Sequence, residues 1–162
     1  MKSKCIREWK DKIMSELSQD DRIIEALGLN DGESPDDLIW NRLFPHLWIP
    51  TTEDEVKSYI MVEIQIPERR SRSNTSESDI WVHPIVVFDV MVHQEDMHMN
   101  LAGESGTRMD YLAELVEDAF DGRKDFGVGI LKLKSDLADS INTTYRVRHL
   151  VFETVDVVGV CG

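Results

Sequence analysis

Residues 81–93, WVHPIVVFDVMVH, are the most strand-like stretch of the sequence. β-Branched and aromatic side chains alternate along it at a period of two, so that Val86, Phe88 and Val90 share one face. This pattern predicts a long strand that is buried on one face and partly covered on the other. Pro84 has no N–H to donate to a ladder, so we expect the start of this strand to lie at a sheet edge or a bulge.

Two further stretches have the texture of long strands that could pair with the first. Residues 58–66, SYIMVEIQI, place Ile60, Val62 and Ile64 on the core side and Met61 and Glu63 on the outer side. The polar stretch 67–79 joins them to the first strand, which predicts a hairpin with a flexible tip. Residues 144–158 predict a last strand of matching length, preceded by a short strand over 126–134 and a polar, turn-like stretch over 135–141.

Helices are predicted from apolar spacing and from capping residues. Residues 4–18 form an amphipathic pattern, and a short helix capped by Asp20 or Asp21 ends at Gly28. Ser34 followed by Pro35 is typical of a helix start, which predicts a third helix up to residue 44. A fourth helix is predicted over residues 108–120, with Thr107 as its cap.

This order of elements predicts one α+β domain over residues 1–162, because strands paired in hairpins flank a helix. We expect a mainly antiparallel sheet of about four long strands, with the helices packed on it. Residues 1–50 would form a helical N-terminal part, and residues 58–158 the sheet with one helix between its strand pairs. A chain of 162 residues can bury one real core and is too short for two domains.

Charge and composition exclude several classes of protein. The net charge of −13 has the wrong sign for broad binding to nucleic acid, although solubility alone would also explain an acidic surface. We find no apolar run long enough to span a membrane and no signal peptide, so no membrane association is expected. Cys5 and Cys161 lie at opposite ends of the sequence; they could pair, but reduced thiols are the simpler expectation.

The candidates for metal or catalytic chemistry are weak. His83, Asp89 and His93 share a strand face but span ten residues, on the order of 33 Å at roughly 3.3 Å per residue, so they cannot meet at one ion. His93 and His98 could still approach each other across a loop. Glu63 and Gln65 resemble the D…(E/D)-x-K pattern of metal-dependent nucleases, but a glutamine replaces the lysine. We therefore predict no enzyme, no metal and no cofactor.

Two groups of residues are candidates for protein interfaces. Arg69, Arg70 and Arg72 are the only dense basic cluster in this acidic chain. They would form a solvated loop, or a loop that orders against an acidic neighbour or a phosphate backbone. Trp40 precedes and Trp48 belongs to the rigid apolar segment FPHLWIP, residues 44–50, which would be a plug on the core or, if exposed, a docking patch.

The element order resembles the small neck proteins of tailed bacteriophages, above all the tail terminator, or tail-completion and head–tail joining, family. The resemblance runs from about Gln19 onward. It is carried by DDRIIEALGL, by the hairpin SYIMVEIQIP…WVHPIVVFDVMVHQ, by the helix RMDYLAELVEDAF and by the final pair GVGILKLK and TYRVRHLVFETVDV.

The resemblance implies a non-enzymatic virion protein that is assembled in the cytoplasm of the bacterial host. Such proteins form a homohexameric ring that ends the tail tube and joins it to the connector or stopper proteins on the head side. DNA passes through the ring without specific binding. Three alternatives stay open: a stopper or head-completion protein, a metal-dependent phage nuclease acting through Glu63, and a regulatory or immunity-type adaptor that docks through FPHLWIP.

Overall fold

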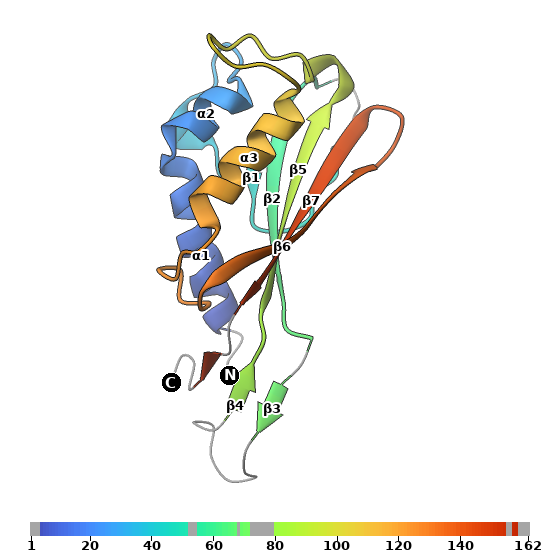
Figure 1. Ribbon diagram of the computed structural model, residues 1–162. Coiled ribbons are helices and arrows are strands. Elements are labelled where there is room, and N and C mark those ends of the chain that lie inside the picture. The colour runs from blue at the N-terminus through green and yellow to red at the C-terminus, as the bar shows by residue number, and fades with distance from the viewer. Residues whose placement is uncertain (1–3, 52–54, 68, 72–79, 155–156, 159–162) are drawn as a thin grey trace.

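Helices cover one face of a twisted, mainly antiparallel sheet, which confirms the α+β class (Figure 1). The computed structural model describes residues 4–51, 55–67, 69–71, 80–154 and 157–158. Three helices lie on the covered face: α1 (Lys4–Gln19), α2 (Asp21–Leu27) and α3 (Arg108–Phe120). Asp20 caps α2, Gly28 ends it at φ 65°, and Thr107 caps α3, as the sequence predicted.

Five strands form the main sheet in the order β1-β2-β5-β7-β6. All neighbours are antiparallel except β1 and β2, which are parallel. A smaller sheet has the order β3-β4-β8 and extends from the main sheet (Figure 1). The bounds of the strands are β1 (Leu43–Phe44), β2 (Ser58–Gln65), β3 (Arg69–Ser71), β4 (Ile80–Val82), β5 (Ile85–His93), β6 (Leu131–Ser140), β7 (Tyr145–Thr154) and β8 (Val157–Val158).

The central strand is β5, which pairs along its whole length with β2 on one side and β7 on the other. The predicted strand over residues 81–93 is interrupted at His83 and Pro84, where β4 passes into β5. Pro84 supplies a carbonyl there, which accepts a hydrogen bond of 2.8 Å from the Thr154 hydroxyl. The predicted irregularity at Pro84 is therefore confirmed.

Both faces of the sheet bury apolar side chains, in two separate clusters. The helix side holds the larger cluster, in which Phe88 contacts Phe120 and Phe152 at centroid distances of 4.7 and 5.4 Å. The far side holds a smaller aromatic cluster around Tyr59 and Tyr145. Met61 belongs to this second cluster and is buried, so its expected outward, solvated position is wrong.

The predicted third helix is absent from the described residues, and the helical part ends with α2 instead of near residue 50. Ser34 and Pro35 start only a 3-10 turn, Pro35–Asp37, and β1 follows. Consecutive residues Leu43 and Phe44 are buried on opposite faces of the sheet, which a strand allows and a helix does not. The local start signal was correct, but burial on two faces overrode it.

The predicted turn over residues 135–141 is also wrong, because β6 continues to Ser140. This strand lies at the edge of the sheet, and most of its side chains beyond Leu133 are exposed. It therefore lacks the apolar alternation that identifies a half-buried strand. A register shift between Leu133 and Ser135 further disturbs the pattern.

Cys5 corrects one more expectation. It lies in the first turn of α1, is fully buried, and is disulfide-bonded instead of being a reduced thiol. Separation along the sequence gives no measure of the distance between two cysteines in the fold, and that distance decides whether they can pair.

Truncation of Phe88 tests the larger cluster. Phe88→Ala should lower the free energy of unfolding by about 3–5 kcal/mol, since it leaves a cavity between β5 and α3. The matched control is Val87→Ala, on the half-buried opposite face of the same strand, which should cost less than about 1.5 kcal/mol. Urea unfolding followed by circular dichroism measures both, and equal losses would contradict the two-face assignment.

Candidate interaction surface

A buried arginine organises the segment that contains the predicted docking residues. Arg42 is 0% exposed and uses all its N–H groups as donors. Nε and Nη2 bind the two carboxylate oxygens of Glu33 at 2.9 and 2.7 Å. The remaining donors bind the carbonyls of Leu27, Gly28 and Ser58 at 3.1 to 3.3 Å. Arg42 thus joins the C-terminus of α2, the following loop and the start of β2.

Glu33 is held ionised by this arrangement. Burial raises the pKa of its carboxyl, but hydrogen bonds from Arg42 and from the Asn30 N–H, with the Arg42 charge, outweigh burial and hold the pKa below its ordinary value. The pair is therefore a charged, bidentate bridge in which the guanidinium is fully desolvated.

Next to Arg42, the chain makes a tight turn that directs Trp40 outward. The N–H groups of Asn41, Arg42 and Leu43 all point to the Leu38 carbonyl, at 2.8 to 3.1 Å. Trp40 donates its own N–H to the Leu43 carbonyl at 2.8 Å and has a φ of 73°, in the left-handed region. Such a conformation is rare for a bulky residue and costs on the order of 1–3 kcal/mol. The result is a tryptophan that is 61% exposed.

The segment FPHLWIP is divided between the core and the surface. Trp48 is half-buried and stacks on Phe44, with ring centroids 4.4 Å apart, so this part is a plug on the second cluster. Leu47 and Ile49, on either side of Trp48, are 56% and 51% exposed. We call Trp40, Leu47 and Ile49 the apolar surface. The plug interpretation is therefore confirmed for Trp48, whereas docking through the exposed residues of the segment stays a prediction.

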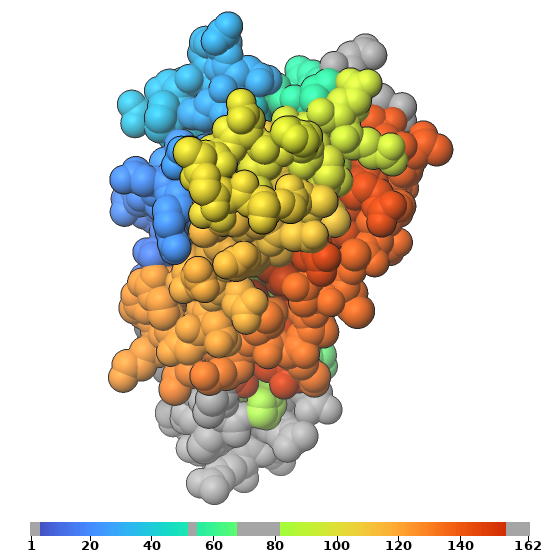
Figure 2. All heavy atoms as spheres, turned by 45° about the horizontal axis from the view of Figure 1, so that its top comes forward, coloured from blue at the N-terminus to red at the C-terminus, as the bar shows by residue number. Residues whose placement is uncertain are grey.

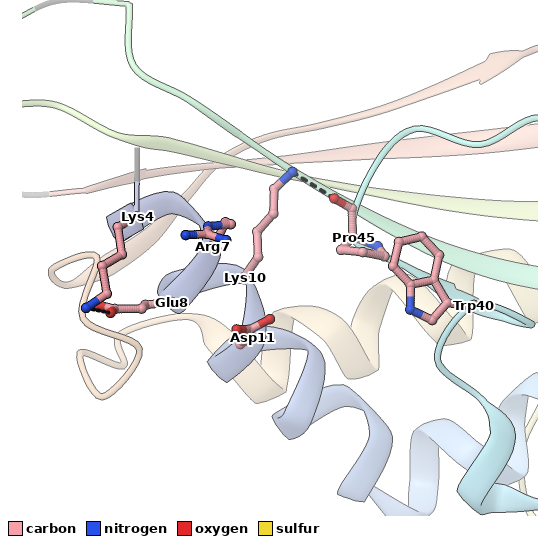
Figure 3. Close-up of a pocket in the computed structure, with 7 residues that line it drawn as sticks. All are labelled: Lys4, Arg7, Glu8, Lys10, Asp11, Trp40 and Pro45. Carbon is pink, nitrogen blue, oxygen red and sulfur yellow. Dashed lines mark hydrogen bonds and ion pairs between the residues drawn. The ribbon is translucent and has the colours of Figure 1, made fainter. Parts of the chain in front are cut away.

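An open groove of about 650 Å³ lies between α1 and this segment (Figure 3). Lys10 reaches across it from α1 and donates to the Pro45 carbonyl at 2.7 Å, while Trp40 lies at the other side. Lys4 pairs with Glu8 at 3.3 Å. The seven residues lining the groove are Lys4, Arg7, Glu8, Lys10, Asp11, Trp40 and Pro45. Arg7 is exposed and has no ion-pair partner within the described part of the chain.

Lys10 also closes the free edge of β2. Its ammonium lies 2.5 Å from Oε1 of Glu63, and the same oxygen accepts the N–H of Ile64 at 3.1 Å. In the described structure, β1 covers β2 only at Ile60 and Met61. Lys10 and Glu63 lie beside Ile64, on the part of the β2 edge that β1 leaves uncovered. Charged groups at a sheet edge prevent another strand from pairing there. Glu63 therefore has a structural partner, and no divalent ion is needed to explain its carboxylate.

The opposite edge of the sheet is open. Among the strands that the structure describes, β6 pairs only with β7, and its first half carries Lys132, Lys134 and the register shift, all of which discourage pairing. Its second half, residues 135–140, reads SDLADS and has neither lysine nor proline. Leu137 is 64% exposed in this half, while Asp136 is engaged by Arg148 at 2.9 Å. We call residues 135–140 the open edge.

The predicted metal candidates do not gather. His93 is buried and its Nδ1 accepts the Glu95 N–H, whereas His98 is exposed. Asp89 instead lies 2.5 Å from Nδ1 of His149 on β7, a pair that sequence reasoning missed because the two residues are 60 positions apart. Within the described ranges, no three His, Cys, Asp or Glu side chains are placed to hold a metal ion.

The predicted basic cluster is described only in part. Arg69 and Arg70 belong to β3, which pairs with β4 and confirms the hairpin. Arg72 and the rest of the expected tip, residues 72–79, lie outside the described residues. The role of this cluster as an interface stays a prediction.

A protein-family model named YomW matches residues 16–154, which include the whole main sheet, the apolar surface and the open edge. The chain belongs to the YomW family. That family takes its name from a protein derived from a Bacillus phage, so this YomW chain is phage-associated. No curated protein and no solved structure matches it. None of the helices described in this YomW protein is long and apolar enough to cross a membrane.

Removal of the buried guanidinium should be costly. Arg42→Met should lower the free energy of unfolding by about 3–5 kcal/mol, because Glu33 and three carbonyls lose their donors. Arg22→Met is the control: this exposed cation pairs with Asp118 at 3.6 Å, and its loss should cost less than about 1 kcal/mol. Urea unfolding measures both variants, and similar costs would refute the organising role of Arg42.

The Glu33 bridge should also appear in the pH dependence of stability. A carboxyl whose folded pKa is depressed stabilises the fold above its unfolded pKa of 4.5 and loses that contribution as the pH falls through the folded value. The stability advantage of the wild type over Glu33→Gln should therefore be constant near neutral pH and shrink below pH 4.5. Unfolding titrations of both proteins from pH 7 to about 3 measure it. A difference independent of pH would contradict the ionised bridge.

Proposed function

We propose that this phage-associated protein is a structural neck protein of a tailed phage. It would form a ring that terminates the tail tube and joins it to the head-side connector or stopper proteins. It would act in the virion, after assembly in the cytoplasm of the bacterial host, and would need no metal or cofactor.

The observation that carries the proposal is that the two edges of the sheet differ. The open edge presents Leu137, and the apolar surface presents Trp40 beside β1, at the opposite end of the strand order. Figure 2 shows the red-orange atoms of the β6–β7 hairpin on the side away from the blue atoms of α1 and α2. Two different patches on opposite sides permit head-to-tail contacts, and such contacts close into rings when the rotation between copies allows it.

Charge supports the same role. A net charge of −13 lets DNA pass through a ring without adhering, since no excess of cations is available to replace condensed counterions. The apolar side chains would then serve contacts between proteins. An exposed Trp40, Leu47 and Ile49 together are otherwise unfavourable on the surface of a monomer.

The first experiment is the native mass of the purified protein by light scattering across a range of concentrations, with negative-stain imaging of large species. We expect rings of about six copies, alone or after addition of the tail tube protein of the same phage. Duplex DNA should not be retained by the protein at roughly physiological salt.

Two results would contradict the proposal. One is a protein that stays monomeric at every concentration and also in the presence of tail tubes. The other is Mg²⁺-dependent cleavage of DNA that is lost in Glu63→Gln, which would favour the nuclease alternative. Glu63→Gln must first be shown to fold, because Lys10 loses its charged partner.

A further inference from the structure

We infer that neighbouring copies meet head to tail, with the open edge of one copy seated on the apolar surface and groove of the next. This inference rests on the proposed ring, and it assigns the contact to named residues. It makes Leu137 and Asp139 one half of the interface, and Trp40 and Arg7 the other half.

The apolar part of the argument comes from exposure. Leu137 and Trp40 are the two most exposed large apolar side chains among the described residues, at 64% and 61%. They lie at opposite edges of the five-stranded sheet. Leu47 and Ile49, in the segment that follows β1, add two further exposed apolar side chains, at 56% and 51%. Mutual burial of these groups removes the largest unfavourable surface on each copy.

The structure also prepares each half for contact. Trp40 is fixed by the turn around the Leu38 carbonyl, which is anchored by Arg42, so little order has to be gained on binding. On the other copy, the open edge is a regular strand held by β7 and by the Asp136–Arg148–Asp110 bridge, at 2.9 and 2.7 Å. Both halves are thus presented by rigid elements.

Charge complementarity selects the second copy as the occupant. The groove beside Trp40 contains Arg7, an exposed cation without an ion-pair partner in the described part of the chain. The open edge contains Asp139, an exposed anion whose carboxylate, as far as the described ranges show, accepts only the N–H of its neighbour Ser140. Arg7 lines the same groove as Trp40, and Asp139 lies two residues after Leu137 on β6. One contact can therefore bury the apolar groups and pair the charges.

Backbone pairing between two sheets is a different arrangement, and the geometry disfavours it for the head-to-tail case. Lys10 and Glu63 block the edge of β2, so the open edge of a neighbour cannot extend the sheet there. Two open edges could still pair with each other around a twofold axis. That symmetric contact would not involve Trp40, which makes the two arrangements distinguishable.

The test uses Trp40→Ala and Leu137→Asp in the full chain, with Ile130→Asp as a matched control at another exposed apolar position. Each test variant should weaken ring formation at least about 30-fold in concentration, because it removes one side of every contact. Ile130→Asp should leave ring formation unchanged. Circular dichroism and urea unfolding must show that all three variants remain folded.

Mixing the two test variants gives the decisive result. Trp40→Ala keeps an intact open edge and Leu137→Asp keeps an intact apolar surface, so together they should form a 1:1 heterodimer that cannot grow further. Sedimentation velocity and native mass spectrometry detect it. If only Leu137→Asp prevents association and the mixture gives no heterodimer, the contact is a symmetric pairing of open edges and the inference is wrong.

A charge reversal provides the second test. Arg7→Glu and Asp139→Lys should each weaken ring formation by about tenfold, and the double variant should restore it, since every contact then holds a reversed pair. If the wild type forms rings and every one of these variants forms them equally well, the inferred contact is overturned and the proposed function is left intact. A wild-type protein that never self-associates, alone or on tail tubes, would overturn both.

Discussion

The arrangement of the N-terminal half depends on one buried guanidinium. Arg42 satisfies the carbonyls at the end of α2, neutralises Glu33 and binds the first residue of β2. A desolvated cation is tolerated in a core only when each of its donors has a partner, and here each has one. The position of α2 against the sheet, the short β1 and the outward direction of Trp40 all follow from the groups that this side chain brings together.

The main sheet ends in two unlike edges, β1 with its flanking segment on one side and β6 on the other. β5 is paired on both sides, and its helix-facing side chains are fully buried, so it can contribute no surface on that side. The exposed side chains that a partner could contact therefore lie on β6 and on the segment that flanks β1. The difference between these two edges supports the proposed assembly role more than any pocket does.

The sequence was informative wherever burial was one-sided or a cap was local. The alternation in residues 58–66 and 81–93 predicted β2 and β5, and Asp20 and Thr107 marked α2 and α3. It failed where tertiary contacts decide: Phe44 is buried on the far face, which turns an expected helix into β1, and Leu137 belongs to an edge strand without alternation. The burial of Arg42 could not be predicted, because the sequence around a single arginine does not show that its side chain is desolvated.

The closed edge at Lys10 and Glu63 sets a limit on how this protein can stack. Regarded as a unit for strand pairing, the main sheet is close to monovalent: β6 can accept one further strand, whereas β1 at the other end has only two residues and Lys10 and Glu63 block the part of β2 beyond it. A monovalent unit cannot extend into a fibre, whatever its concentration, since the first pairing event consumes its capacity. A protein made in many copies would thereby be protected from runaway ribbon growth through its main sheet.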